Sequence, residues 1–218
     1  HDFRRFCAAP DLALHVTRVP SGEDLTPESI LEMETALPCA AALLPPGASF
    51  DCVAYACTSG TALIGPDRVA DLIAGAVRTR ATSNPLTATV AALRALGVHR
   101  IGMISPYIDS VATPIRVALT AQGFEVAATL SFGEQTEARV ARIDPASILD
   151  AALEMAQGAP LEALFISCTN LRALDILEEV EARTGLPVVT SNSALAWHMF
   201  RHCRARPSWT PGRLLAAC

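Results

Sequence analysis

Two short segments, far apart in the chain, share a pattern that places a cysteine where it can act on a substrate. Residues 53–59 and 164–170 are each a largely apolar run that ends in Cys-Thr, with Cys57 in the first segment and Cys168 in the second. We interpret the repeat as a duplication, which puts the two thiols at equivalent strand ends of two similar lobes. If the lobes face each other, one thiol can remove a proton from a carbon centre and the other can deliver one to the opposite face.

The residues that follow each cysteine suit the binding of a carboxylate. Thr58 and Ser59 lie in the sequence Thr-Ser-Gly-Thr after Cys57, which can present backbone N–H groups and hydroxyls at the start of a helix. Thr169 and Asn170 take the same place after the second cysteine. We expect these donors to lower the pKa of the neighbouring thiol, which is ~8.5 for an unperturbed cysteine. A buried structural cysteine is the alternative interpretation of either thiol taken alone.

A second repeat, Thr-Ser-Asn, adds polar side chains to the candidate site. It ends at Asn84 in the first half and at Asn192 in the second, and each asparagine precedes a helix start, so that helix capping and ligand binding both fit. Tyr107 fits either a strand-end aromatic residue or a hydroxyl donor to a carboxylate or enolate oxygen. His198 and His202 have a helical spacing that suits a metal, but no third ligand is evident, and we expect no metal site.

Strands and helices alternate along most of the predicted structure. The predicted strands cover residues 12–19, 52–56, 100–105, 125–131, 163–167 and 187–190. The predicted helices cover residues 27–37, 67–79, 85–96, 112–122, 145–157, 174–184 and 193–202, and residues 204–218 are predicted to be irregular. Such alternation indicates an α/β fold with parallel sheets, whose ligands bind at the carboxyl ends of the strands.

The composition argues against several classes of function. All 17 basic residues are arginines, and without a lysine the chain cannot form the Schiff base of a pyridoxal-phosphate enzyme or of an aldolase. The net charge of −5 and the scattered arginines argue against a nucleic-acid partner. No apolar stretch approaches the ~20 residues of a membrane span. The seven cysteines have no disulfide or zinc spacing, which indicates free thiols in a reducing, cytoplasmic environment.

Three motifs resemble one known superfamily. Residues 55–61 (Tyr-Ala-Cys-Thr-Ser-Gly-Thr), 105–109 (Ser-Pro-Tyr-Ile-Asp) and 166–172 (Ile-Ser-Cys-Thr-Asn-Leu-Arg) are similar to the aspartate/glutamate racemase superfamily, in its branch of maleate cis–trans isomerases and arylmalonate decarboxylases. Within that branch the chain most resembles the ectoine-utilisation proteins, also at residues 190–192 and 196–198. The resemblance extends over nearly the whole chain.

The resemblance implies two pseudo-symmetric flavodoxin-like lobes with parallel sheets and an active-site cleft between them. We expect the first lobe in residues 1–84, completed by residues 191–218, and the second lobe in residues 85–190. In the first lobe, the counterpart of the strand at 100–105 is expected before His1. The superfamily also implies a small carboxylate as substrate, no cofactor, and a homodimer.

The resemblance further implies cofactor-free chemistry with Cys57 and Cys168 as the catalytic groups. The positions that match the family's carboxylate- or enolate-holding residues are Thr58, Ser59, Tyr107 and Thr169. The related decarboxylases keep one of the two cysteines, so the presence of both favours an isomerase or racemase. A two-base route and a covalent thiol-addition route both fit two thiols. The alternatives are an arylmalonate-type decarboxylase and a carboxylate-binding protein without catalytic activity.

Overall fold

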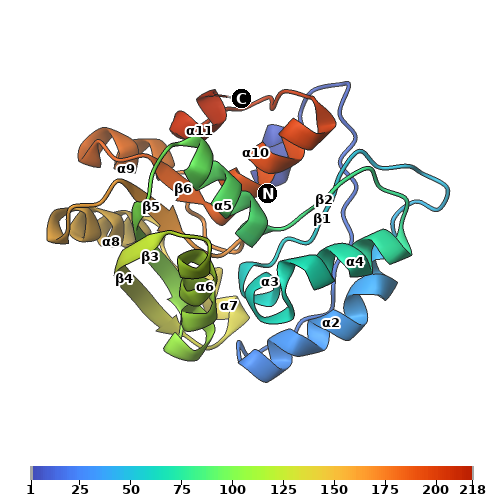
Figure 1. Ribbon diagram of the computed structural model, residues 1–218, viewed down its shortest axis with the longest axis horizontal. Coiled ribbons are helices and arrows are strands. Elements are labelled where there is room, and N and C mark those ends of the chain that lie inside the picture. Colours follow the sequence, from blue (N-terminus) through green and yellow to red (C-terminus); the bar gives the residue numbers. More distant parts are fainter. Residues whose placement is uncertain (1, 218) are drawn as a thin grey trace.

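Two parallel sheets organise the computed structural model, which describes residues 2–217 (Figure 1). The larger sheet has the strand order β4-β3-β5-β6, formed by Glu125–Glu134, Arg100–Tyr107, Ala163–Ile166 and Val188–Thr190. The smaller sheet pairs β1 (Val53–Ala54) with β2 (Thr82–Ser83). Neighbouring strands are parallel in both sheets. The predicted α/β fold with parallel sheets is therefore confirmed.

Helices connect and surround the strands. They are α1 (Asp2–Phe6), α2 (Pro27–Ala41), α3 (Thr58–Ile64), α4 (Pro66–Ala76), α5 (Pro85–Ala95), α6 (Asp109–Ala121), α7 (Glu137–Val140), α8 (Pro145–Gly158), α9 (Leu177–Thr184), α10 (Ser191–Cys203) and α11 (Gly212–Ala216). Their first residues follow from local chemistry. The side chains of Asn84 and Asp144 cap α5 and α8, and each is followed by a proline, whose fixed φ suits the first helical position.

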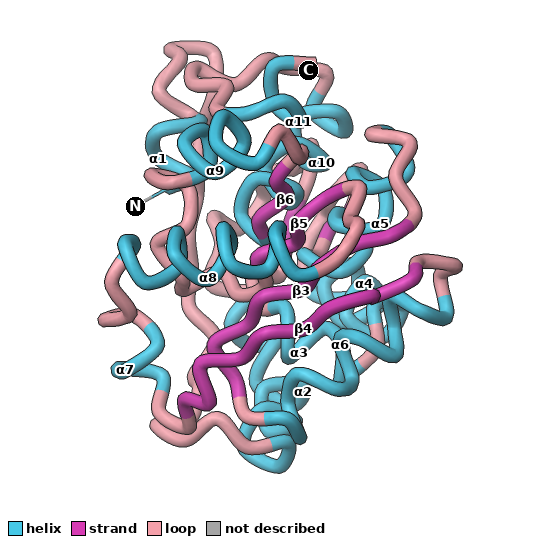
Figure 2. The backbone as a smooth tube through the Cα atoms, turned by 90° about the vertical axis from the view of Figure 1, so that its left-hand side faces the viewer, coloured by secondary structure: helices cyan, strands magenta, loops and turns pink. Residues whose placement is uncertain are grey.

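The larger sheet is covered on both faces. The connection from β3 to β4 and the connection from β4 back to β5 run in opposite directions across the sheet. Because such crossovers are right-handed, α6 lies on one face and α8 on the other, as Figure 2 shows. All four residues of β5 are buried, as are the residues of β3 from Ile101 to Tyr107. These continuous apolar strands form the centre of the core.

The strand register brings the carboxyl ends of the central strands together. Ile104 pairs with Ile166, and Ile166 pairs with Thr190 on the next strand. The residues that follow these pairs therefore lie at one edge of the sheet. In the smaller sheet Ala54 pairs with Ser83, and the Tyr55 N–H donates to the Ser83 carbonyl at 3.1 Å. The candidate site lies at the carboxyl ends of the strands of both sheets.

Two predictions about elements are wrong. Residues 12–19 form no strand: their alternating pattern gives the segment a half-buried side, but no neighbouring strand pairs with it, and Val16 is 74% exposed. Residues 204–218, predicted as irregular, contain α11. By contrast, the helix start expected after Cys57 is confirmed: α3 begins at Thr58, where the Cys57 side chain caps it, although Thr-Ser-Gly-Thr has low intrinsic helix propensity.

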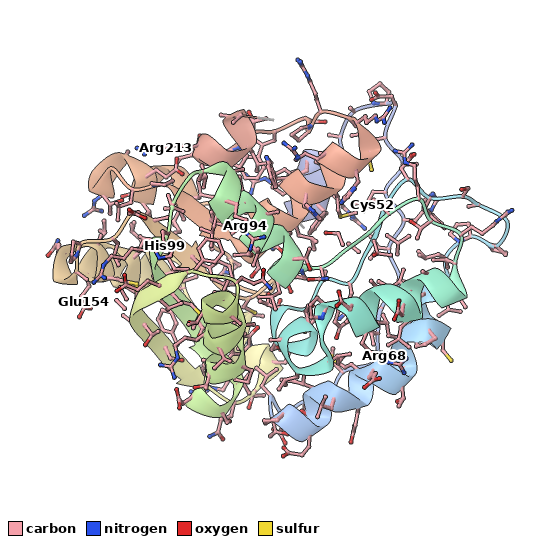
Figure 3. The ribbon with its side chains drawn as sticks, in the orientation of Figure 1. Cys52, Arg68, Arg94, His99, Glu154 and Arg213 are labelled. Atoms are coloured by element: carbon pink, nitrogen blue, oxygen red, sulfur yellow. The ribbon has the colours of Figure 1, made fainter. Side chains whose placement is uncertain are left out.

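The Arg68 side chain on α4 pairs with Glu34 on α2, with Nε and Oε1 2.7 Å apart; Arg68 is labelled in Figure 3. Among the helices within residues 2–217, none combines the length and the apolar character needed to cross a membrane.

Candidate active site

The first cysteine of the repeat caps a helix. Cys57 follows β1 in extended conformation and is the N-cap residue of α3. Its sulfur accepts a hydrogen bond from the Gly60 N–H at 3.3 Å and lies 3.6 Å from the Ser59 hydroxyl oxygen. The sulfur thus occupies the position where a helix N-terminus favours negative charge.

The second cysteine lies in a strained turn after β5. Cys168 has a φ of +113°, a conformation that residues other than glycine adopt rarely and that costs about 1–3 kcal/mol. Its N–H donates to the Ser191 hydroxyl at 3.0 Å, and its sulfur accepts from the Asn170 N–H at 3.3 Å. These two hydrogen bonds on either side of the residue help to hold the unusual backbone conformation.

Hydrogen bonds join the two cysteine loops to each other. The Thr58 hydroxyl donates to Ser191 Oγ at 2.8 Å, so that Ser191 accepts from both loops. The Thr169 hydroxyl donates to the Ala56 carbonyl at 2.8 Å, and the Thr169 carbonyl accepts from the Asn192 side chain at 2.9 Å. Segments separated by more than 100 residues in the sequence therefore form one continuous site.

Each thiol has a tyrosine hydroxyl beside it, and these are the two tyrosines of the chain. Tyr107, at the end of β3, is 2% exposed and hydrogen bonds to the Cys168 sulfur and to Ser59. Tyr55 is also buried, and its hydroxyl contacts both Met33 Sδ, to which it donates at 3.6 Å, and the Cys57 sulfur. A side chain at Gly60 would overlap the Tyr55 hydroxyl and come within 3.1 Å of Cys57 Sγ, so only glycine leaves the contact between Tyr55 and Cys57 intact.

Burial determines the resting protonation of both thiols. It raises the pKa of Cys57, although hydrogen bonds from Ser59, the Gly60 N–H and Tyr55 lower it. Burial likewise raises the pKa of Cys168 to about 12, against the lowering effect of Tyr107 and the Asn170 N–H. Our expectation of a lowered thiol pKa is therefore wrong, because desolvation outweighs the donors. Cys57 has three such donors and Cys168 two, which makes Cys57 the better candidate for the thiolate.

A carboxylate that the sequence analysis missed lies near both thiols. Glu137, the first residue of α7, accepts a hydrogen bond from the Asn170 side chain at 2.6 Å, and its negative charge raises the pKa of Cys57 and of Cys168. It lies in a polar segment, Glu-Gln-Thr-Glu-Ala-Arg, that is indistinguishable in sequence from a solvated loop. No sequence signal marked it.

The repeated Thr-Ser-Asn segments have different contacts in the two halves. Asn84 accepts the Thr87 N–H at 2.8 Å and caps α5, while the Asn192 side chain donates to Asp2 at 2.7 Å and to Thr169. Their contact with a ligand stays a prediction. The residue of the repeat that joins the cysteine loops is Ser191, whereas its counterpart Ser83 bonds to His198.

The two histidines of α10 contact each other. Their rings are 4.5 Å apart, and burial lowers the pKa of His198 to about 4. Within residues 2–217 no group of three or more His, Cys, Asp or Glu side chains is arranged to hold a metal ion.

Comparison with known sequences points to one family and two activities. The arylmalonate decarboxylase family matches residues 28–215. Arylmalonate decarboxylase from Bordetella bronchiseptica is 35% identical over 133 residues, which cover 59% of this chain and 55% of that protein. Maleate isomerase from Nocardia farcinica is 28% identical over 159 residues, which cover 68% of this chain and 62% of that protein. The chain thus matches less than two thirds of the length of either relative.

Solved structures extend the likeness to three dimensions. A liganded double mutant of arylmalonate decarboxylase superposes with a TM-score of 0.86 at 28% identity, covering 96% of this chain and 90% of that one. The maleate cis–trans isomerase of Nocardia farcinica, solved as a cysteine-to-serine mutant with a covalently bound succinylcysteine intermediate, gives a TM-score of 0.81 at 21% identity. That match covers 100% of this chain and 94% of the isomerase, and concerns the fold alone.

Proposed function

Because the chain belongs to the arylmalonate decarboxylase family, we propose that it is a cofactor-independent isomerase or racemase that acts on a small carboxylic acid or amino acid through Cys57 and Cys168. One observation carries the proposal: the cysteine loops after β1 and β5 are joined through Ser191, and each thiol has its own tyrosine hydroxyl. A protein that only binds a carboxylate has no need of two hydrogen-bonded thiols in neighbouring, connected loops.

In a two-base reaction the cysteines work on opposite faces of the α-carbon. The thiolate of one cysteine takes the α-proton, and the electron pair of the broken C–H bond moves into the carboxylate as an enolate. The thiol of the other cysteine then gives its proton to the opposite face, so that the two side chains exchange protonation states. Donors that hold the enolate oxygens typically contribute about 10²–10³ in rate each. Ser59 and Tyr107 lie between the thiols and suit this part.

In a covalent reaction the substrate is an alkene. The Cys57 thiolate adds to one alkene carbon, and Cys168 protonates the neighbouring carbon. The former carbon–carbon double bond is now single and rotates. Cys168 then takes a proton back, the C–S bond breaks, and the trans isomer leaves. The assignment of Cys57 as nucleophile rests on its three hydrogen-bond donors and its position at the start of α3. The succinylcysteine of the Nocardia farcinica isomerase supports this route in a protein of similar fold.

A decarboxylase is the second candidate, and the sequence match to the Bordetella bronchiseptica enzyme favours it. In that reaction loss of CO₂ from a malonate would leave the enolate, and one thiol would protonate it. The second thiol would then have no chemical part, which is why we rank this reaction below isomerisation or racemisation. Release of CO₂ from arylmalonates distinguishes the two.

A place in ectoine catabolism is a narrower proposal. It rests on the resemblance of residues 55–61, 166–172 and 196–198 to the ectoine-utilisation proteins of this branch. It predicts that 2,4-diaminobutyrate or an aspartate-like acid is the best substrate in a panel of small acids. A clear preference for maleate or an arylmalonate would contradict it.

The test is proton exchange in D₂O with a panel of amino acids, maleate and arylmalonates, read by NMR and chiral chromatography. We expect one compound to exchange its α-proton or to isomerise. Cys57→Ala and Cys168→Ala should each lower the rate by about 10²–10⁴, the usual contribution of a general acid or base. Cys39→Ala is the matched control, because Cys39 is an exposed free cysteine on α2. Full activity in either site variant would refute the two-thiol mechanism.

A further inference from the structure

The position of Glu137 is fixed by contacts from two directions. Its N–H donates to the Glu23 carbonyl at 3.1 Å, and the preceding Gln135 carbonyl accepts from the Leu25 N–H at 2.7 Å, so the segment that precedes α2 holds the start of α7. On the other side Glu137 Oε1 accepts from Asn170 Nδ2 at 2.6 Å. The main chain at Glu137 is thus held by the segment before α2, and its carboxylate is oriented by Asn170.

The charge of Glu137 has no cation beside it. Asn170 connects it to Cys168, whose sulfur the Asn170 N–H contacts at 3.3 Å. Within residues 2–217 Oε2 accepts no hydrogen bond, and Glu137 takes part in no ion pair. The neighbouring Arg139 pairs with Glu134 at 2.9 Å. Arg68, Arg94 and Arg213, labelled in Figure 3, belong to α4, α5 and α11 and form no ion pair with Glu137.

The side chains that contact the two thiols carry neutral hydroxyls. Tyr55 and Ser59 face Cys57, and Tyr107 faces Cys168. A bound dicarboxylate would bring two negative charges to a site that already holds Glu137 and must form a thiolate. Like charges at short range in a poorly solvated site repel strongly. An ammonium group would instead pair with the carboxylate and offset its charge.

We propose that Glu137 determines specificity by pairing with an ammonium group of the substrate, so that the site selects an amino acid with one carboxylate over a dicarboxylate or a malonate. This inference rests on the proposed function of the cysteine site and names its substrate class. The free Oε2 atom is the acceptor for the ammonium group, while Oε1 keeps its bond to Asn170. The charge of Glu137 raises the pKa of both thiols, and an ammonium group beside it offsets that charge. Binding of an amino acid therefore favours the thiolate that removes its α-proton.

The test uses a series of four-carbon acids that differ in charge. Butyrate, 2-aminobutyrate and 2,4-diaminobutyrate carry none, one and two ammonium groups, and maleate carries a second carboxylate. Each is titrated against iodoacetamide labelling of Cys57 at pH 8, and peptide mass spectrometry gives the half-protecting concentration. We expect the half-protecting concentration to fall by about tenfold on addition of the first ammonium group, the typical effect of a charge-assisted hydrogen bond. Maleate should protect least.

Glu137→Gln is the variant that isolates the charge. Glutamine keeps an oxygen acceptor for Asn170, so the loop stays in place while the negative charge is lost. The advantage of 2-aminobutyrate over butyrate should fall by about tenfold, and maleate should protect better than in the wild type. Glu134→Gln is the matched control: it removes the same charge three residues away, from a carboxylate that contacts Arg139 and not the site. Its protection series should match the wild type.

The outcomes distinguish a failure of this inference from a failure of the proposed function on which it rests. Protection by butyrate or maleate as strong as by 2-aminobutyrate, or an unchanged preference in Glu137→Gln, overturns the role of Glu137 and leaves the two-thiol site standing. If no acid protects Cys57, and no compound exchanges its α-proton in D₂O, the carboxylate site itself is refuted, and the inference with it.

Discussion

Replacing Ser191 with alanine should separate the two halves of the site. The Ser191 side chain is fully buried at the start of α10, and its oxygen accepts the Thr58 hydroxyl at 2.8 Å and the Cys168 N–H at 3.0 Å. Alanine leaves the packing almost unchanged but removes both bonds. The Cys168 N–H then has no partner, and the turn with φ of +113° loses the contact on its amino-terminal side.

The size of the effect follows from the two donors that lose their acceptor. A buried donor without a partner costs about 1–3 kcal/mol. The Thr58 hydroxyl can rotate toward another acceptor, whereas the N–H of Cys168 cannot, so we expect a loss of about 2–4 kcal/mol in the free energy of unfolding. At about 2–4 °C per kcal/mol for a chain of this length, the melting temperature should fall by roughly 5–15 °C. The turnover rate should fall as well, because the Cys168 sulfur is no longer held.

Thermal and urea unfolding of the variant measure this loss. Ser208→Ala is the control, because Ser208 is exposed and makes no side-chain hydrogen bond within residues 2–217; its stability should change by less than ~0.5 kcal/mol. Thr58→Val and Ser191→Ala combined should cost less than the sum of the single changes, with a coupling of about 0.5–3 kcal/mol. A Ser191→Ala protein as stable and as active as the wild type would show that Ser191 does not join the loops.

Two more predictions concern the thiols themselves. Tyr55→Phe should raise the pKa of Cys57, because it removes a hydroxyl that lowers this pKa. The rate of iodoacetamide labelling at pH 8 should fall about tenfold, since a hydrogen bond to a charged group is worth ~1.5–3 kcal/mol, and an unshifted pH profile would contradict a role of Tyr55. The pKa of Cys168, about 12, lies above its unfolded value of ~8.5, so this thiol stabilises the fold fully below pH ~8.5 and less as the pH rises toward 12. The free energy of unfolding should therefore decline more steeply above pH ~8.5 in the wild type than in Cys168→Ala, and parallel curves would argue against a raised pKa.

Local patterns predicted most of the second half of the fold. The strand β5 was expected at residues 163–167 and lies at Ala163–Ile166, and helix α8 was expected at 145–157 and spans Pro145–Gly158. A strand buried on both faces has a continuous apolar run, and a Pro after a capping Asp marks a helix start, so the sequence alone carries these signals. Residues 12–19 were expected to form a strand and do not, because alternation of apolar residues specifies a buried side but not a partner strand.

The features of the site likewise divide into those predicted by local sequence patterns and those decided by tertiary packing. The repeat in the sequence by itself identified Cys57 and Cys168 and placed them at strand ends, since a Cys-Thr pair after an apolar run is a local pattern. Only the tertiary structure decided that Ser191, and not Asn192, joins the loops, that Tyr55 faces the Cys57 sulfur, and that Glu137 lies near both thiols. The pKa of each thiol was also beyond the sequence: neighbouring donors can be read from it, but desolvation depends on how residues from distant segments pack around the sulfur.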